Sequence, residues 1–293
     1  MEIKKNKKIR LAISIIIRAV FFFLFPAIFS TAFSGIKYLC TTIISREPFE
    51  MNGFLITLIA ILLFTIFFGR YFCGYGCVFG TYGDVLYQIA SWVRTAFRKK
   101  MGKPKTLPKL SPTLGKIFSY GKYAVLLVVV LICLLSDKAS QIGTISPWTP
   151  FSRLQALQAP AKGSGLAIIF LILISIGMLL VPRFFCRFLC PLGAIFSLLP
   201  VLPFSVVTRK KEDCVRGCNL CERGCPADLQ LADTQTEERQ SMGECFNCSK
   251  CAYSCPKSNA SAKTMPGGKI GFVWIIVKGA ILFAICFYLT KMM

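Results

Sequence analysis

The chain has 293 residues, of which 55% are hydrophobic and only 16% are charged, and its mean hydropathy is +0.62. This composition excludes an ordinary soluble protein and indicates a membrane protein. Lys and Arg number 35 against 13 Asp and Glu, which gives a net charge of +22. The chain has 15 cysteines and no histidine, which excludes His-ligated haem, a Ser-His-Asp triad and a His-based zinc or di-iron centre. Any metal is therefore expected to be held by sulfur.

Five apolar stretches are candidates for membrane spans, because a helix needs about 20 apolar residues to cross the hydrocarbon core. The second and fourth of them are short, and each leads directly into an aromatic, cysteine-bearing segment. The predicted spans are residues 9–33, 53–68, 117–135, 166–181 and 270–289.

The basic residues predict the orientation, because short loops rich in Lys and Arg stay in the cytoplasm. Residues 4–10 and 94–109 are strongly basic, whereas the loops at 35–52 and 136–165 are not. This pattern predicts a multi-pass protein of the cytoplasmic (inner) membrane, with its N-terminus and residues 183–269 in the cytoplasm. A cleaved signal peptide ending near residue 34 is a rival interpretation, but it would invert this assignment.

The positive charge has two further interpretations. The basic residues flank spans and match no nucleic-acid-binding signature, so membrane lipid is the expected counter-charge and no nucleic acid is expected. The basic face at 94–109 is also suited to docking an acidic electron carrier.

Residues 208–269 differ from the rest of the chain, because they contain eight of its 13 acidic residues and eight cysteines in two runs. The second run reads C-x2-C-x2-C-x3-C-P, which is the bacterial ferredoxin spacing for a 4Fe-4S cluster, and the first run has one more residue in its first gap. In this spacing three cysteines bind one cluster and the fourth binds the other. The predicted ligands are Cys214, Cys218, Cys221 and Cys255 for cluster 1, and Cys245, Cys248, Cys251 and Cys225 for cluster 2.

Three other uses of these cysteines remain open. A zinc ribbon would not explain why the fourth cysteine of each run is followed by proline, at Pro226 and Pro256. Disulfides need an oxidising compartment, which the predicted orientation disfavours. Clusters with a purely structural role form the third alternative.

A second cysteine pattern occurs twice, each time where a span is predicted to reach the cytoplasm. The motif R-[YF]-F-C-x3-C-x2-G begins at Arg70 and returns 113 residues later at Arg183. It indicates a parallel repeat of a two-span unit. On a helix, C-x3-C places both sulfurs on one face, so two such helices could present four thiols to one site. Ligation of a metal or third centre, thiol–disulfide exchange and packing all remain open for Cys73, Cys77, Cys186 and Cys190.

Other residues near these motifs are given simpler roles. Cys40, Cys133 and Cys286 are expected to be packing residues. Asp84, Arg70 and Arg183 are candidates for contact with a quinone headgroup, although arginines that snorkel at span ends are the more common case.

The combination of spans, two C-x3-C motifs and a two-run cysteine module resembles the NapH/NosR-type polyferredoxin membrane proteins. The resemblance implies a quinol dehydrogenase component or membrane electron conduit with two 4Fe-4S clusters, and some relatives assist metalloenzyme assembly. Three departures are visible: Val78 follows Cys77 where the second motif has Pro191, a fifth span follows the module, and no large flavin-binding domain is present. Any flavin is therefore expected on a separate partner protein.

The expected fold is a mainly α polytopic membrane protein with about five transmembrane helices and a small α+β bacterial-ferredoxin-like module. The favoured function is electron transfer through two 4Fe-4S clusters, between a cytoplasmic donor or membrane quinone and a partner redox protein, as an electron-transfer subunit of an oxidoreductase. The alternative is an assembly or regulatory factor that reduces a metal or senses redox state. The predicted parts are a first repeat at 1–93, a basic linker at 94–116, a second repeat at 117–207, the ferredoxin-like domain at 208–269 and a final helix at 270–293.

Overall fold

The computed structural model describes residues 2–45, 48, 50–100, 112–135, 146–155, 158–159, 164–229, 231–233 and 242–292. Residues 101–111 of the predicted basic linker and most of the loop at 136–165 therefore lie outside the described residues. The chain forms two compact units, each assembled from separate parts of the sequence. Unit 1 comprises Met1–Phe25, Ile59–Val78 and Ile195–Met293, and unit 2 comprises Pro26–Leu58 and Phe79–Ala194. The sequential domain boundaries drawn from the sequence stay a prediction.

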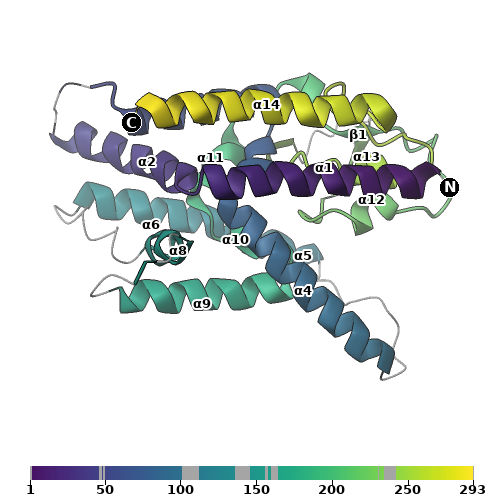
Figure 1. Ribbon diagram of the computed structural model, residues 1–293, viewed down its shortest axis with the longest axis horizontal. Helices are drawn as coiled ribbons and strands as arrows, with labels where there is room; N and C mark the ends of the chain where they lie inside the picture. Colours follow the sequence, from purple (N-terminus) through teal and green to yellow (C-terminus); the bar gives the residue numbers. More distant parts are fainter. Residues whose placement is uncertain are drawn as a thin grey trace. The chain divides into compact units, whose positions relative to one another are not determined.

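Unit 1 combines two long helices with the cysteine-rich module. Helix α1 (Glu2–Leu24) and helix α14 (Gly268–Met292) run side by side (Figure 1, purple and yellow), and their aromatic side chains meet where Phe283 contacts Phe21 with ring centroids 6.4 Å apart. The unit also contains part of α3 (Gly53–Phe68), η1 (Phe72–Gly76), η3 (Pro203–Ser205), β1 (Thr208–Arg209), α12 (Leu220–Arg223), β2 (Ala232–Asp233), η4 (Met242–Glu244) and α13 (Lys250–Ser254).

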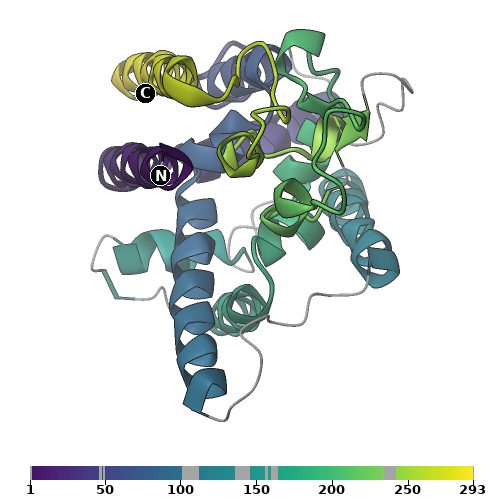
Figure 2. The same ribbon diagram turned by 90° about the vertical axis from the view of Figure 1, so that its right-hand side faces the viewer.

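The module itself contains little regular structure in its described part. Strands β1 and β2 pair in parallel, with Thr208 opposite Ala232, and Thr208 also forms an antiparallel bridge to Ser261. A small apolar core that includes Val207, Leu231 and Met265 lies beneath the cysteine runs. Helix α13 packs against α1, so the module lies along a helix whose first turns carry the basic residues (Figure 1, Figure 2).

Unit 2 consists of helices in its described part. Trp148 lies at its centre, stacked on Phe33 at 4.8 Å and edge-on to Phe185 at 5.7 Å. Because these rings come from α2, α8 and α10, the aromatic cluster joins three helices. The helices are α2 (Ile28–Ser45), most of α4 (Val78–Lys100), α5 (Pro112–Ser119), α6 (Gly121–Leu135), α8 (Trp148–Gln155), α9 (Gly165–Leu180), α10 (Phe184–Phe188) and part of α11 (Pro191–Leu198).

The described helices support a membrane protein, with fewer full-length spans than the sequence predicts. Two stretches, Leu114–Cys133 and Gly268–Lys291, are long and apolar enough to cross a membrane. Helices α3 and α9 are apolar but have only 16 residues each. The span predicted at 9–33 is not one continuous helix, because α1 ends at Leu24 and α2 starts at Ile28 after a bend of 61°. The bent pair is a third candidate span only if both helices together form one broken span. Pro26 lies at this break, where it lacks the N–H that a continuous helix requires.

Candidate functional site

The two cysteine runs share most features of their local backbone geometry. The residue before the second cysteine has a positive φ in both, 71° at Gly217 and 51° at Asn247. The third cysteine of each run lies on a one-turn helix, α12 or α13, and the fourth follows that helix. Three residues later φ is again positive, at Asp228 and Ser258. The extra residue of the first run is therefore accommodated ahead of Gly217. The runs differ after the second cysteine, where φ is −130° at Asn219 but 60° at Ser249.

The first cavity is lined by cysteines of both runs. It brings Cys214, Cys218 and Cys221 together with Cys255, and its other walls include Arg209, Leu220 and Lys257. Several N–H groups point at the sulfurs: Asn259 donates from its backbone to Cys255 at 3.3 Å and from its amide to Cys214 at 3.4 Å. Arg209 donates to Cys221 at 3.4 Å and pairs with Glu222 at 2.6 Å. Such donors suit thiolate ligands, because hydrogen bonds to sulfur help set cluster potential.

The second cavity is lined by three cysteines of the second run and the fourth cysteine of the first run. Cys245, Cys248 and Cys251 line it together with Cys225, among apolar residues that include Val206, Phe246 and Met265. Cys221 also lies in its wall, so the two cavities are neighbours. Within the described ranges no three or more Cys, Asp or Glu side chains are grouped closely enough to hold a single metal ion. A cluster fits this spacing better, because each of its thiolates binds a different iron.

Burial affects the thiols of the second cavity most strongly. Desolvation, followed by the neighbouring Cys248 and Cys225, raises the pKa of Cys245 to about 12. Burial likewise raises the pKa of Cys251 well above its ordinary value and raises that of Cys225. Without iron these groups are therefore neutral thiols at pH 7, so binding must release protons as it forms thiolates.

The first C-x3-C motif is not a continuous helix, which corrects the prediction from sequence. Cys73 lies within the π-turn η1, and Cys77 follows it with extended backbone angles. The Cys77 N–H donates to the Phe72 carbonyl at 2.7 Å, five residues back, and α4 then begins at Val78. Both cysteines are buried, with 7% and 4% of their surface exposed.

The second motif repeats this turn in unit 2. Cys186 lies on α10, and the Cys190 N–H donates to the Phe185 carbonyl at 2.9 Å, again five residues back. The Cys190 sulfur accepts the Gly193 N–H at 3.2 Å at the start of α11. Cys73 and Cys77 belong to unit 1 and Cys186 and Cys190 to unit 2, so a four-thiol site built from both pairs stays a prediction.

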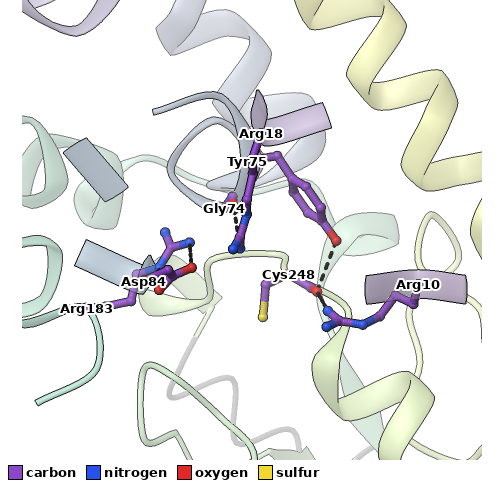
Figure 3. A network of polar contacts seen from close by, with 7 residues as sticks. All are labelled: Arg10, Arg18, Gly74, Tyr75, Asp84, Arg183 and Cys248. Atoms are coloured by element: carbon purple, nitrogen blue, oxygen red, sulfur yellow. Dashed lines mark hydrogen bonds and ion pairs between the residues drawn. The ribbon is translucent and has the colours of Figure 1, made fainter. Parts of the chain in front are cut away.

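Within unit 1, the first C-x3-C motif is bonded to the loop that carries Cys245 and Cys248, here called the 244–249 loop. Tyr75 donates from its hydroxyl to the Cys248 carbonyl at 3.1 Å, and Arg10 of α1 donates to the same oxygen at 2.8 Å (Figure 3). Arg18 donates to the Gly74 carbonyl at 2.9 Å (Figure 3). The residues between Cys73 and Cys77 are therefore tied directly to the backbone of the second cavity.

Gly74 allows the closest approach of the motif to this loop, and we expect Gly74→Ala to separate them. A Cβ at this position would overlap the Phe246 carbonyl oxygen, and backbone on both sides leaves little room to move. The expected loss is about 1–3 kcal/mol of stability, as for overpacking elsewhere, together with a reduced iron content. Thermal unfolding and iron analysis check this result. Gly165→Ala is the matched control, because nothing lies within 4 Å of its Cβ, and equal behaviour of the two variants would contradict the packing argument.

The two arginines that begin the motifs are buried and paired, so the snorkelling interpretation of them is wrong. Arg70 pairs with Glu244 at 3.2 Å in unit 1. Arg183 and Asp84 form a two-bond pair in unit 2, at 2.8 and 2.6 Å (Figure 3). Both guanidiniums are at most 2% exposed. These contacts assign Arg70, Arg183 and Asp84 to internal ion pairs.

Sequence reasoning missed two other features. Cys40 and Cys133, on the packed helices α2 and α6 of unit 2, lie close to each other, although nothing in their sequence positions links them. Lys278 lies in the middle of α14, only 2% exposed, and donates to the Asn247 side chain at 3.0 Å. A lysine within an apolar helix of 25 residues is a recognisable signal, because ionisable groups at such positions are usually functional. Cys286 is fully buried in α14, in keeping with a packing role.

The chain is similar in sequence to a known protein family and to individual proteins. The family described as a 4Fe-4S binding domain matches residues 53–104 and 164–203, and each matched segment contains one C-x3-C motif. The uncharacterized protein MJ0749 of Methanocaldococcus jannaschii is 30% identical over 71% of this chain and 70% of its own length. No solved structure matches the chain.

One relative has a name that indicates a redox role, and another is named as a regulatory protein. The ferredoxin-type protein NapH of Escherichia coli is 27% identical over 64% of this chain and 59% of its own length. The regulatory protein NosR of Pseudomonas aeruginosa is 24% identical over 67% of this chain and 26% of its own length. Together with the 4Fe-4S match and the apolar helices, these similarities indicate an electron-transport role for an iron–sulfur membrane protein. The chain belongs to the NapH/NosR-type iron–sulfur proteins.

Proposed function

We propose that the chain is a membrane-bound electron-transfer protein that relays electrons through two 4Fe-4S clusters. The observation that carries this proposal is the pair of neighbouring cavities, each lined by three cysteines of one run and the fourth of the other. Cys214, Cys218, Cys221 and Cys255 would hold cluster 1, and Cys245, Cys248, Cys251 and Cys225 would hold cluster 2. Such clusters exchange single electrons and need no acid–base residue, which suits a chain without histidine.

The protein's own residues position and insulate the two sites. Val206, Phe246 and Met265 exclude water from the second cavity. The first cavity is more open, because Val215 and Leu220 beside its cysteines are 47% and 45% exposed. We therefore propose that the first cavity faces a soluble carrier or another redox subunit, and that the second cavity faces the membrane side, where a quinone or a partner protein completes the path.

The proposed membrane arrangement has five spans, with the short helices α3 and α9 crossing together with the aromatic segments that follow them. The basic first turns of α1 and the module that packs along this helix support a cytoplasmic location for both. The shared turn of the two C-x3-C motifs supports the parallel repeat. Because each segment that matches the 4Fe-4S domain contains one of these motifs, a third centre at Cys73, Cys77, Cys186 and Cys190 is part of the proposal.

Iron and sulfide analysis tests the proposal. Anaerobically purified protein is expected to contain about eight iron atoms and eight sulfides per chain, as two 4Fe-4S clusters require, with an EPR signal after reduction by dithionite. The same analysis is repeated after all four C-x3-C cysteines are changed to serine. An unchanged signal assigns those cysteines to packing or thiol chemistry, whereas additional iron that the change removes assigns them a third centre. A stoichiometric zinc content without sulfide would overturn the proposed function.

A second candidate function is assembly or regulation of another redox enzyme. The similarity to NosR, which is named as a regulatory protein, favours it. In that case the clusters or the C-x3-C thiols would reduce a metal or respond to redox state. Reversible reduction of the clusters by quinol in membranes would favour electron relay, and activity that follows metal insertion into a second protein would favour assembly.

A further inference from the structure

Two buried cations contact the 244–249 loop from different helices of unit 1. Arg10 of α1 is 8% exposed and donates to the Cys248 carbonyl at 2.8 Å. Lys278 of α14 is 2% exposed and donates to the Asn247 side-chain oxygen at 3.0 Å. Both acceptors are neutral oxygens, and both belong to residues at or next to a predicted ligand of cluster 2.

The loop is built to keep these contacts. Asn247 adopts a φ of 51°, and its amide nitrogen donates to the Ser205 carbonyl at 3.1 Å, which aims its oxygen at Lys278. Phe246 and Ser249 are each 2% exposed, so the loop is shielded from water. A third cation, Arg70, lies over the Phe246 ring, but Glu244 pairs with it at 3.2 Å.

The first cavity has a different charge balance. Arg209, which lines this cavity and is partly exposed, bonds the Glu222 carboxylate at 2.6 Å, so the two charges offset each other. Cys214 and Cys218 are only half-buried, and their neighbours Lys211 and Arg216 are exposed, where water and salt screen them. Arg10 and Lys278 are far less screened because they are buried.

We infer that Arg10 and Lys278 raise the reduction potential of the cluster held at Cys245, Cys248, Cys251 and Cys225, and so make it the electron-accepting member of the pair. Reduction adds one negative charge to a buried site, and nearby positive charge stabilises that state. Burial alone would oppose it. This inference rests on the proposed function, and it adds a direction of flow: from the exposed first cavity toward the second cavity and the 73–77 segment bonded to it.

EPR-monitored redox titration of the purified full-length protein tests this inference. Lys278→Met is expected to lower the equilibrium constant for reduction of one cluster by at least about tenfold, which corresponds to about 59 mV for a one-electron couple, and to leave the other unchanged. Lys278→Arg, which keeps the positive charge, should restore the wild-type equilibrium constant for reduction. Lys291→Met is the control, because Lys291 is an exposed lysine on the same helix.

Three further variants complete the experiment. Arg10→Gln, compared with Arg10→Lys, repeats the test from α1 if Lys278→Met does not fold. Cys214→Ala removes a ligand of cluster 1, so the cluster that remains identifies which potential has shifted. Unchanged potentials, equal shifts in both clusters, or a wild-type cluster 2 with the lower potential would overturn the inference while leaving an eight-iron relay intact. Absence of iron from the wild-type protein would instead refute the proposed function.

Discussion

Cys255→Ala is expected to abolish cluster 1, although Cys255 belongs to the second run of cysteines. It shares the first cavity with Cys214, Cys218 and Cys221, so its loss removes one of their four ligands. We expect about half of the iron to be lost, with a residual EPR spectrum and midpoint potential that match those of Cys214→Ala. Iron analysis and EPR of the two variants side by side measure this.

Cys225→Ala and Cys248→Ala are the matched pair of variants for cluster 2. Cys225 is the fourth cysteine of the first run, but it lines the second cavity with Cys245, Cys248 and Cys251. Both variants should retain cluster 1 and lose cluster 2, the reverse of the first pair. If each run instead held its own cluster, Cys255→Ala would resemble Cys248→Ala, and the crossed arrangement would be wrong.

Short sequence patterns predicted local structure well where only a few backbone conformations are possible. The gaps of two or three residues between cysteines allow only a tight loop. Both runs have a positive φ before the second cysteine, a one-turn helix at the third and a positive φ three residues after the fourth. The apolar stretches at 53–68, 166–181 and 270–289 correspond to α3, α9 and α14 within a few residues. Local spacing and apolar length therefore predicted these elements without any tertiary information.

The bend between α1 and α2, the turns of the C-x3-C motifs and the long-range side-chain contacts could not be predicted in this way. Apolar length alone merged α1 and α2 into one span, although Pro26 marked the break. The i and i+4 rule placed each C-x3-C motif on a helix, whereas hydrogen bonds five residues long widen both turns. The partners of Arg70 and Lys278 lie 174 and 31 residues away, a separation that no local pattern encodes.

Asp84→Asn is expected to cause the largest loss of stability among single changes in unit 2. The Arg183 guanidinium is 2% exposed, and its Nε and Nη2 atoms donate to the two Asp84 oxygens at 2.8 and 2.6 Å. The amide keeps the shape of the carboxylate but removes its charge, which leaves an uncompensated buried cation. Removal of one partner of such a pair costs about 3–5 kcal/mol. Thermal unfolding of the purified protein in detergent measures this loss.

A double variant tests whether the loss of stability comes from the unpaired charge or from a change of shape. Asp84→Leu combined with Arg183→Met removes both charges and keeps apolar volume, and replacement of a buried ion pair by packed apolar groups is often neutral or stabilising. We therefore expect the double variant to unfold at a higher temperature than Asp84→Asn. The ion pair links Arg183, which follows α9, to Asp84 on α4. The two helices also approach closely beside it, because a Cβ at Gly83 would lie 3.0 Å from the Met178 sulfur of α9. If Asp84→Asn unfolded like the wild type, the carboxylate would be dispensable for this contact, and a role in binding a ligand would again be open to Asp84.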